Sequence, residues 1–143
     1  MQVVDPVDPG GAHPLPELRL TGLPAVVDAL GQARRQLVAW AGRSGLNDEQ
    51  VDDLGLAAYE AMANVVDHAY DGPGGLFDLY ACRRDDMVTV SVTDHGRWKP
   101  PTGGAQSWRG RGLQIIERVS QEFELCQHPR GTTLAMRWAL AGR

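Results

Sequence analysis

Apolar residues recur at helical spacing in the first half of the chain. Between Val26 and Trp40 they fall on one side of a helix, which predicts an amphipathic helix over about Pro24–Gly42, with the proline in its first turn. Asn47 and Gln50 form a capping-box pattern, Asn-x-x-Gln. A second helix is therefore expected to begin at this cap and to run to about Tyr70, before a breaker rich in glycine.

Other segments have the length and the apolar pattern of strands. The predicted strands are Glu17–Leu23, Leu76–Arg84, Met87–Asp94, Glu122–Gln127 and Thr132–Leu140. We expect a loop over His95–Arg109 and a third helix over Arg111–Gln121. Two hairpins and three helices in this order predict an α+β fold. We expect a two-layer α/β sandwich, with a mixed, mainly antiparallel sheet and the helices on one face.

Composition narrows the class of protein. The chain has 143 residues, which suits one domain, and we expect residues 1–16, rich in proline, to be a flexible tail and residues 17–143 to form the domain. A net charge of −4 without a basic run argues against direct nucleic-acid binding. No apolar run approaches the roughly 20 residues that span a bilayer, and the N-terminus lacks a signal-peptide pattern. The protein is therefore expected to be cytoplasmic without membrane contact, and Cys82 and Cys126 to be buried free thiols.

The second predicted helix carries a polar stripe. Glu60, Asn64 and His68 are spaced i, i+4 and i+8 and so share one side of the helix. Alanines at positions 57, 58, 61 and 63 are expected to leave room there for a ligand. A carboxylate can act as a general base, and the carboxamide oxygen one turn later is a hard ligand suited to Mg²⁺. The alternative for this helix alone is a solvated polar face.

Two further segments suit nucleotide recognition. Asp94, at the end of a predicted strand, could accept a hydrogen bond from an exocyclic amine such as that of adenine, and Gly96 would let the backbone approach a flat ring. Arg109-Gly110-Arg111-Gly112-Leu113 opens a predicted helix, where glycines, positive charge and unpaired N–H groups favour phosphate. The alternatives are an ordinary Asp/Gly turn and a glycine-rich helix start.

A last segment, Gly131-Thr132-Thr133, begins the final predicted strand, and either hydroxyl could hydrogen-bond a base or a bridging water. Threonines are common at strand starts, so this signal is weak by itself. The order and spacing of all four segments are more specific than any one of them.

Taken in order, the four segments resemble the N-box and the glycine boxes of the GHKL superfamily of gyrase, histidine kinase and MutL ATPases. Within it, Glu60-Ala61-x-x-Asn64-x-x-x-His68-Ala69-Tyr70 is similar to the N-box of the anti-sigma-factor serine kinases of the RsbW kind, and the resemblance spans about Leu18–Trp138. It implies a Bergerat fold that binds ATP and Mg²⁺, with Glu60 as the catalytic base and Asn64 as the metal ligand. The predicted nucleotide-binding residues are Asn64, His68, Asp94, Gly96, Arg109, Gly110, Arg111, Gly112, Leu113 and Thr132.

The resemblance also implies partners: a STAS-domain anti-anti-sigma factor as the substrate, a sigma factor, and a second copy of the chain in a homodimer. Two other functions stay open, namely a nucleotide-binding module that sequesters a partner without catalysis and an ATPase fragment of a histidine kinase. Glu60 favours a kinase over a pure binding module, and the chain has no room for the dimerisation helices of a sensor histidine kinase. The sequence departs from the family at Trp98, where a second glycine often follows Asp-x-Gly, and its lid segment is short.

Overall fold

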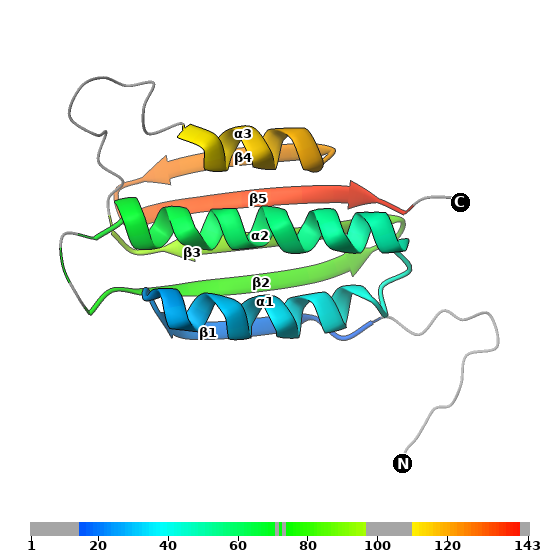
Figure 1. Cartoon of the computed structure of the whole chain (residues 1–143), viewed down its shortest axis with the longest axis horizontal. Helices are drawn as coiled ribbons and strands as arrows, with labels where there is room; N and C mark the ends of the chain where they lie inside the picture. The colour runs from blue at the N-terminus through cyan, green and yellow to red at the C-terminus, as the bar shows by residue number, and fades with distance from the viewer. Residues whose placement is uncertain (1–14, 71, 73, 97–109, 141–143) are drawn as a thin grey trace, which may run out of the picture.

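The computed structural model describes residues 15–70, 72, 74–96 and 110–140. Within them the chain forms one layer of helices over one sheet (Figure 1). The elements are β1 (Leu18–Pro24), α1 (Val27–Ala41), α2 (Asp48–His68), β2 (Leu76–Arg84), β3 (Met87–Asp94), α3 (Gly110–Val119), β4 (Glu122–His128) and β5 (Gly131–Ala139). The predicted α+β sandwich with helices on one face is confirmed.

The sheet has the strand order β1-β2-β3-β5-β4. Each of its four strand pairings is antiparallel, so the expected mixed component does not occur among the described strands. The reason is topological, because α3 connects β3 to β4, and β5 then returns between these two strands and pairs antiparallel with both. This pairing places the end of β3 beside the start of β5, at one end of the molecule.

Strict alternation along β3 sends every second side chain towards the helices. Val88, Val90 and Val92 are fully or almost fully buried, whereas the residues between them are only half-buried. The core lies between this face of the sheet and the three helices, and its largest buried side chains include Trp138 and Phe77. Full burial of a side chain of this kind stabilises the fold by about 1.5–3 kcal/mol.

The start of α2 agrees with its predicted cap. The Asn47 side chain accepts a hydrogen bond from the Gln50 N–H at 2.8 Å, and the Gln50 side chain accepts one from the Asn47 N–H at 3.0 Å. The start of α1 differs from its prediction, because Pro24 is the last residue of β1 and α1 begins at Val27. β1 is an edge strand, and an edge strand can hold a proline whose missing N–H would face away from the sheet.

The two cysteines also differ from each other. Both are free, but only Cys82 is buried, and Cys126 is exposed. On the edge strand β4 the half-buried side chains are Phe123 and Leu125, so the next residue, Cys126, points to the other face of the sheet. The expectation of two buried thiols is therefore wrong for Cys126.

The predicted tail and loop fall mainly outside the described residues, which begin at residue 15 and leave out 97–109, including Trp98. Near the start of the described residues, the Pro16 carbonyl oxygen accepts a hydrogen bond of 2.7 Å from Trp40 Nε1. This bond ties the entry to β1 to the C-terminal end of α1. Within the described part of the chain, no helix is both long enough and apolar enough to cross a bilayer.

Candidate active site

Three elements bring most of the predicted site residues to one end of the sandwich (Figure 1). The C-terminal half of α2, the end of β3 and the start of α3 all lie there, and β5 begins beside them. The antiparallel register explains part of this, since Asp94 of β3 is paired with Thr132 of β5. Residues far apart in the sequence thus face a common region.

Asn64 is the clearest sign of a ligand site at this end. Its side chain is 8% exposed, and its amide Nδ2 is buried without a hydrogen-bond partner among the described residues. A buried polar group without a partner is costly, by about 1–3 kcal/mol, so it usually has a functional or unseen partner. A Cβ added at Gly112 would lie 3.0 Å from Asn64 Oδ1 and 3.3 Å from Nδ2. Both ends of the amide therefore lie beside the start of α3.

Glu60 and His68 flank Asn64 on α2, one turn before and one turn after it, and both are half-buried.

The alanines around this stripe serve a different purpose from the expected one. Ala57, Ala58 and Ala61 are buried in the hydrophobic core, and Ala63 is partly buried against it. These small side chains let α2 pack closely and do not leave space for a ligand. The periodic pattern could not separate these two uses of alanine.

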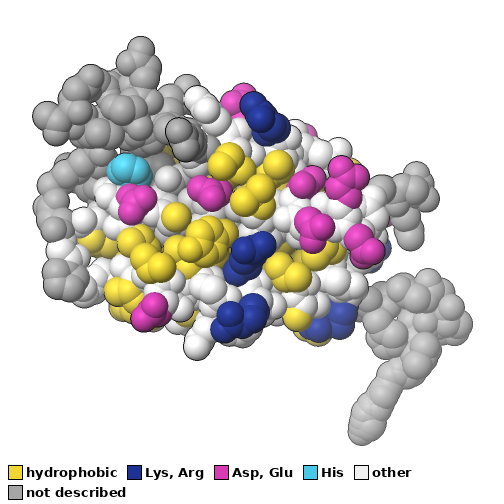
Figure 2. All heavy atoms as spheres, in the orientation of Figure 1, with side chains coloured by type: hydrophobic (Ala, Val, Ile, Leu, Met, Phe, Trp, Pro, Cys, Tyr) yellow, Lys and Arg dark blue, Asp and Glu magenta, His cyan; other side chains and the backbone are white. Residues whose placement is uncertain are grey.

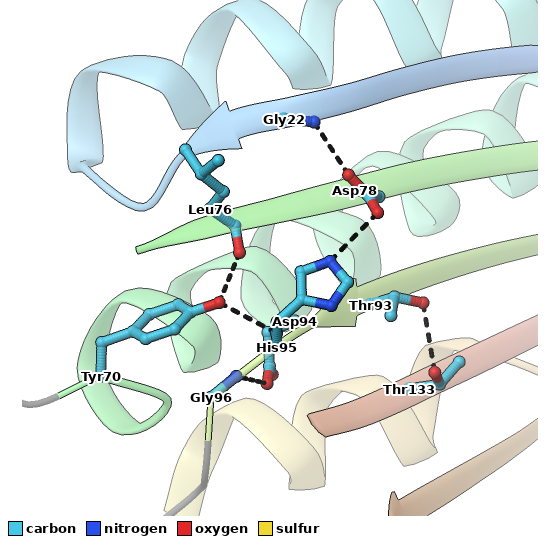
Figure 3. A network of polar contacts seen from close by, with 9 residues as sticks. All are labelled: Gly22, Tyr70, Leu76, Asp78, Thr93, Asp94, His95, Gly96 and Thr133. Carbon is cyan, nitrogen blue, oxygen red and sulfur yellow. Dashed lines mark hydrogen bonds and ion pairs between the residues drawn. The ribbon is translucent and has the colours of Figure 1, made fainter. Parts of the chain in front are cut away.

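The turn after β3 is held tightly (Figure 3). Asp94 is 1% exposed, and its Oδ1 accepts a hydrogen bond of 3.0 Å from the Gly96 N–H. Gly96 lies against the end of α2, where an added Cβ would overlap the Ala69 carbonyl oxygen and approach the Tyr70 ring. Asp94 and Gly96 are therefore brought together with the N-box helix, as the sequence predicted.

The start of β5 completes this end of the sheet. Thr132 is buried, at 2% exposure, and on the other side of the sheet the Thr133 and Thr93 hydroxyls share a hydrogen bond of 3.2 Å. Gly131 has a φ of +149°, and a Cβ on it would overlap the Asp94 carbonyl oxygen. A glycine is needed here because the backbone of β5 begins in contact with the turn that carries Asp94.

We expect Gly131→Ala to lower the free energy of unfolding by about 2–3 kcal/mol, because the new methyl group meets backbone atoms and the φ value disfavours a side chain. Urea denaturation followed by circular dichroism measures this loss. Gly72→Ala is the matched control, since a Cβ at Gly72 meets nothing within 4 Å. Equal stability of the two variants would contradict the tight packing of β5 against the Asp94 turn.

The segment predicted to bind phosphate, residues 109–113, is described only in part. α3 begins at Gly110, and Leu113, 5% exposed, packs in the core, so it anchors the helix and does not present a side chain to a ligand. Arg109 and the side chain of Arg111 lie outside the described residues. The start of α3 lies beside Asn64, so its unpaired N–H groups face the same region.

Tyr70 was not predicted as a site residue. Its hydroxyl donates a hydrogen bond of 2.5 Å to the Leu76 carbonyl oxygen and accepts one of 2.9 Å from the His95 N–H (Figure 3). In the sequence, Tyr70 is predicted only as the end of a helix and as a member of the N-box pattern. Its contacts reach across 25 residues of sequence, which no local pattern reveals.

A separate groove lies between α1 and α2, away from these residues. It has a volume of about 560 Å³ and is lined by apolar, glycine and charged residues, among them Arg34, Val38, Asp52, Gly55 and Tyr59. Figure 2 shows basic side chains in the middle of this helical face and acidic side chains gathered over the N-terminal half of α2. The groove contains none of the predicted nucleotide-binding residues.

Comparison with known proteins assigns the fold to a family. A profile of the histidine kinase-like ATPase domain matches residues 23–138, which is most of the chain. The chain belongs to this ATPase domain family. The match includes α2, the β3 turn, α3 and the start of β5. The family assignment thus covers every element that brings residues to the site.

Relatives place the chain in the RsbW-like group of this ATPase family. It is 35% identical to a serine-protein kinase RsbW of Halalkalibacterium halodurans, in a match that covers 85% of this chain and 82% of that protein. It is 25% identical to an anti-sigma F factor of Caldanaerobacter subterraneus subsp. tengcongensis, over 78% of this chain and 85% of that protein. These matches confirm the resemblance that the N-box indicated.

A solved structure supports the same placement. The crystal structure of the RsbU and RsbW domains of a Mycobacterium tuberculosis protein superposes with a TM-score of 0.70 and 26% identity, over 87% of this chain. This chain spans about a third, 32%, of that chain. The RsbW-like ATPase domain is thus a unit of about this size that also occurs within a longer polypeptide.

Proposed function

We propose that this protein is an ATP-dependent serine protein kinase that acts as an anti-sigma factor. The observation that carries the proposal is the buried Asn64 amide beside the glycine start of α3, one helical turn after Glu60. This arrangement puts a hard oxygen ligand, a carboxylate base and a helix N-terminus together, which is what phosphoryl transfer from a nucleotide needs. The RsbW-like relatives, named as serine-protein kinases, support the same reaction.

In this proposal Glu60 is the general base. The serine hydroxyl oxygen of the substrate protein bonds to the γ-phosphorus, the bond from that phosphorus to the β–γ bridging oxygen breaks, and ADP leaves. Glu60 accepts the hydroxyl proton as this oxygen attacks. It lies on a regular helix and is half-buried, so its carboxylate is held by the fold but remains accessible to a substrate.

Asn64 fits a magnesium site. Its Oδ1 can bind the ion, and its Nδ2, which lacks a partner in the described part of the protein, can donate to a phosphate oxygen. When bound, Mg²⁺ would neutralise negative charge on the phosphates. We assign the phosphates to the start of α3, at Gly110 and Gly112, with Arg109 and Arg111 adding positive charge and His68 at the end of the same stripe.

We assign the adenine to the other side of the same region. Asp94 would accept a hydrogen bond from its amine, and Gly96 and Thr132 would line the site around it. The tight turn at Asp94 supports this role, because a carboxylate whose Oδ1 already accepts from the Gly96 N–H is fixed in orientation before a ligand arrives.

For the partners we propose a STAS-domain anti-anti-sigma factor as the protein that is phosphorylated, a sigma factor as the protein that is sequestered, and a homodimer of this chain. The name of the anti-sigma F relative supports a sigma factor as a partner. A nucleotide-binding module without catalysis remains the second candidate, because a kinase and a sequestering protein could share every binding residue and differ only in the use of Glu60.

Phosphate transfer is the direct test of the proposal. The purified protein is incubated with γ-labelled ATP, Mg²⁺ and STAS-domain proteins encoded near its gene, and label on a serine of the STAS protein is the expected result. Omission of Mg²⁺ should abolish the label. If ATP binds but no STAS protein is labelled, the binding module replaces the kinase as the proposed function.

Asp94→Asn tests the assignment of adenine. A carboxylate only accepts hydrogen bonds and selects an amine donor, whereas an amide both donates and accepts. We expect affinity for ATP to fall about ten- to a hundredfold, corresponding to about 1–3 kcal/mol, and discrimination against GTP to decrease. Isothermal titration with both nucleotides measures the two effects. If the unmutated protein binds ATP and GTP equally well, Asp94 does not read the base.

A further inference from the structure

Tyr70 occupies an unusual position between two glycines. Its ring lies against Gly75, just before β2, and against Gly96, just after β3. A Cβ on Gly75 would overlap one edge of the ring, and a Cβ on Gly96 would lie 2.7 Å from Cε1 on the other edge. The absence of both side chains therefore makes the space that the tyrosine ring fills.

The hydroxyl at the end of this ring joins two strands. It donates to the carbonyl oxygen of Leu76, the first residue of β2, and accepts from the N–H of His95, the residue after β3 (Figure 3). Tyr70 itself follows the C-terminal end of α2. One side chain thus connects the helix that carries Glu60 and Asn64 to the turn that carries Asp94.

A second set of contacts holds the same turn from the outer face of the sheet. His95 Nε2 lies 3.4 Å from Asp78 Oδ2, and Asp78 Oδ1 accepts a hydrogen bond of 2.8 Å from the Gly22 N–H (Figure 3). The His95 side chain is 58% exposed, so solvent screens this contact and it is weak. Tyr70 makes the stronger connection, because its hydroxyl bonds to main-chain atoms of both Leu76 and His95.

We infer that Tyr70 is a positioning residue for nucleotide binding, because its ring and hydroxyl fix the Asp94–Gly96 turn against the end of α2. This inference rests on the proposed nucleotide-binding function and adds the residue that orders the site before the ligand arrives. Order of this kind raises affinity, because the free protein has already restricted the conformations that binding would otherwise have to restrict. Tyr70 acts through Asp94 and Gly96 and does not itself touch the phosphates or the serine.

The test is Tyr70→Phe, which removes only the hydroxyl and keeps the ring between the glycines. Two main-chain groups lose their partner, so we expect ATP affinity to fall about two- to tenfold. Since Tyr70 orients the turn that carries Asp94, the ratio of ATP affinity to GTP affinity should fall as well. The transfer rate at saturating ATP should change less than about twofold, because Glu60 is untouched. A general loss of stability would not change the nucleotide preference.

Amide hydrogen exchange tests the connection without any nucleotide. In the unmutated protein the His95 N–H should be protected, because it donates to the Tyr70 hydroxyl, and in Tyr70→Phe its exchange should become severalfold faster. Tyr80→Phe is the matched control. Tyr80 is half-buried on β2, and the strand alternation places its side chain on the face of the sheet opposite the helices. The guanidinium carbon of Arg19 lies 4.5 Å from the centre of its ring. This control should change neither nucleotide affinity nor His95 exchange.

The outcomes separate this inference from the proposed function. If the unmutated protein binds no ATP, the proposed function fails and the role of Tyr70 in nucleotide binding fails with it. If it binds ATP, and Tyr70→Phe binds ATP with the same affinity and the same preference over GTP, only the inference about Tyr70 is overturned. An unprotected His95 amide in the unmutated protein also overturns it, whether or not the variant folds.

Discussion

Glu60→Gln should retain ATP affinity within about twofold and lose phosphate transfer by about 10²- to 10⁴-fold, the usual contribution of a general base. The two side chains have almost the same shape, so the packing of α2 and the position of Asn64 should survive. Only the ability to accept the serine proton is removed. Some transfer should persist, because phosphoryl transfer depends mainly on positioning and on charge stabilisation. Single-turnover transfer to a STAS-domain protein, with titration of ATP, measures both quantities.

Glu49→Gln is the matched control for this variant, since Glu49 lies on the same helix but is exposed in its first turn. It should transfer phosphate at the unmutated rate. A Glu60→Gln protein that phosphorylates its substrate as fast as this control would show that Glu60 is not the base. Another residue, or the substrate itself, would then accept the proton.

Asn64→Ala should reduce affinity for Mg–ATP by at least about a hundredfold, or about 2.7 kcal/mol, while the protein stays folded. The variant removes the oxygen proposed to bind the ion. It also removes a buried amide that has no partner in the described residues for its Nδ2, so little protein–protein hydrogen bonding is lost. The free energy of unfolding is expected to change by less than about 1 kcal/mol. Isothermal titration and urea denaturation on the same sample give both values.

Asn47, the N-cap residue of α2, should give the opposite result: a loss of stability without a loss of binding. Asn47 caps α2 through its side chain, so Asn47→Ala should lower the free energy of unfolding by about 1 kcal/mol and leave Mg–ATP affinity unchanged. Two Asn→Ala changes on one helix are thus expected to separate stability from binding. If Asn64→Ala is the less stable variant and still binds Mg–ATP, the buried amide has a structural role and the metal assignment is wrong.

The parts of the fold that the sequence predicted best are those with strictly local causes. The bounds of β2 and β3 agree with the prediction, because β3 alternates along its whole length and a short turn separates the two strands. The turn residue Asp85 adopts a left-handed φ of 55°. The cap of α2 was predicted for the same reason, since its two hydrogen bonds join residues three apart. Such features depend on neighbours in sequence, and the sequence contains them directly.

The sequence predicted which residues form the candidate site, and the structure shows that several of them lie near one another. Asn64, Asp94, Gly112 and Thr132 do come to one end of the sandwich, yet no pattern indicated that the Asn64 amide would be buried without a partner for its Nδ2. The connection through Tyr70 depends on the glycines on either side of its ring and on pairing between strands, which are properties of the assembled fold. Pro24 shows the same limit, because both a first helical turn and an edge strand accept a proline.

The positions of the two ends of the described chain have a practical consequence for attachment. β3 runs from Met87 to Asp94, and Ala139 of β5 is paired with Met87, so the exit of the chain lies a full strand away from the Asp94 turn. An eight-residue strand spans roughly 25 Å. The entry lies at the same far end, where Pro16 contacts Trp40 near the end of α1 (Figure 1). A fluorophore, an affinity tag or a whole second domain joined directly before residue 15 or after residue 140 would therefore be attached at the end of the sandwich opposite the proposed nucleotide site.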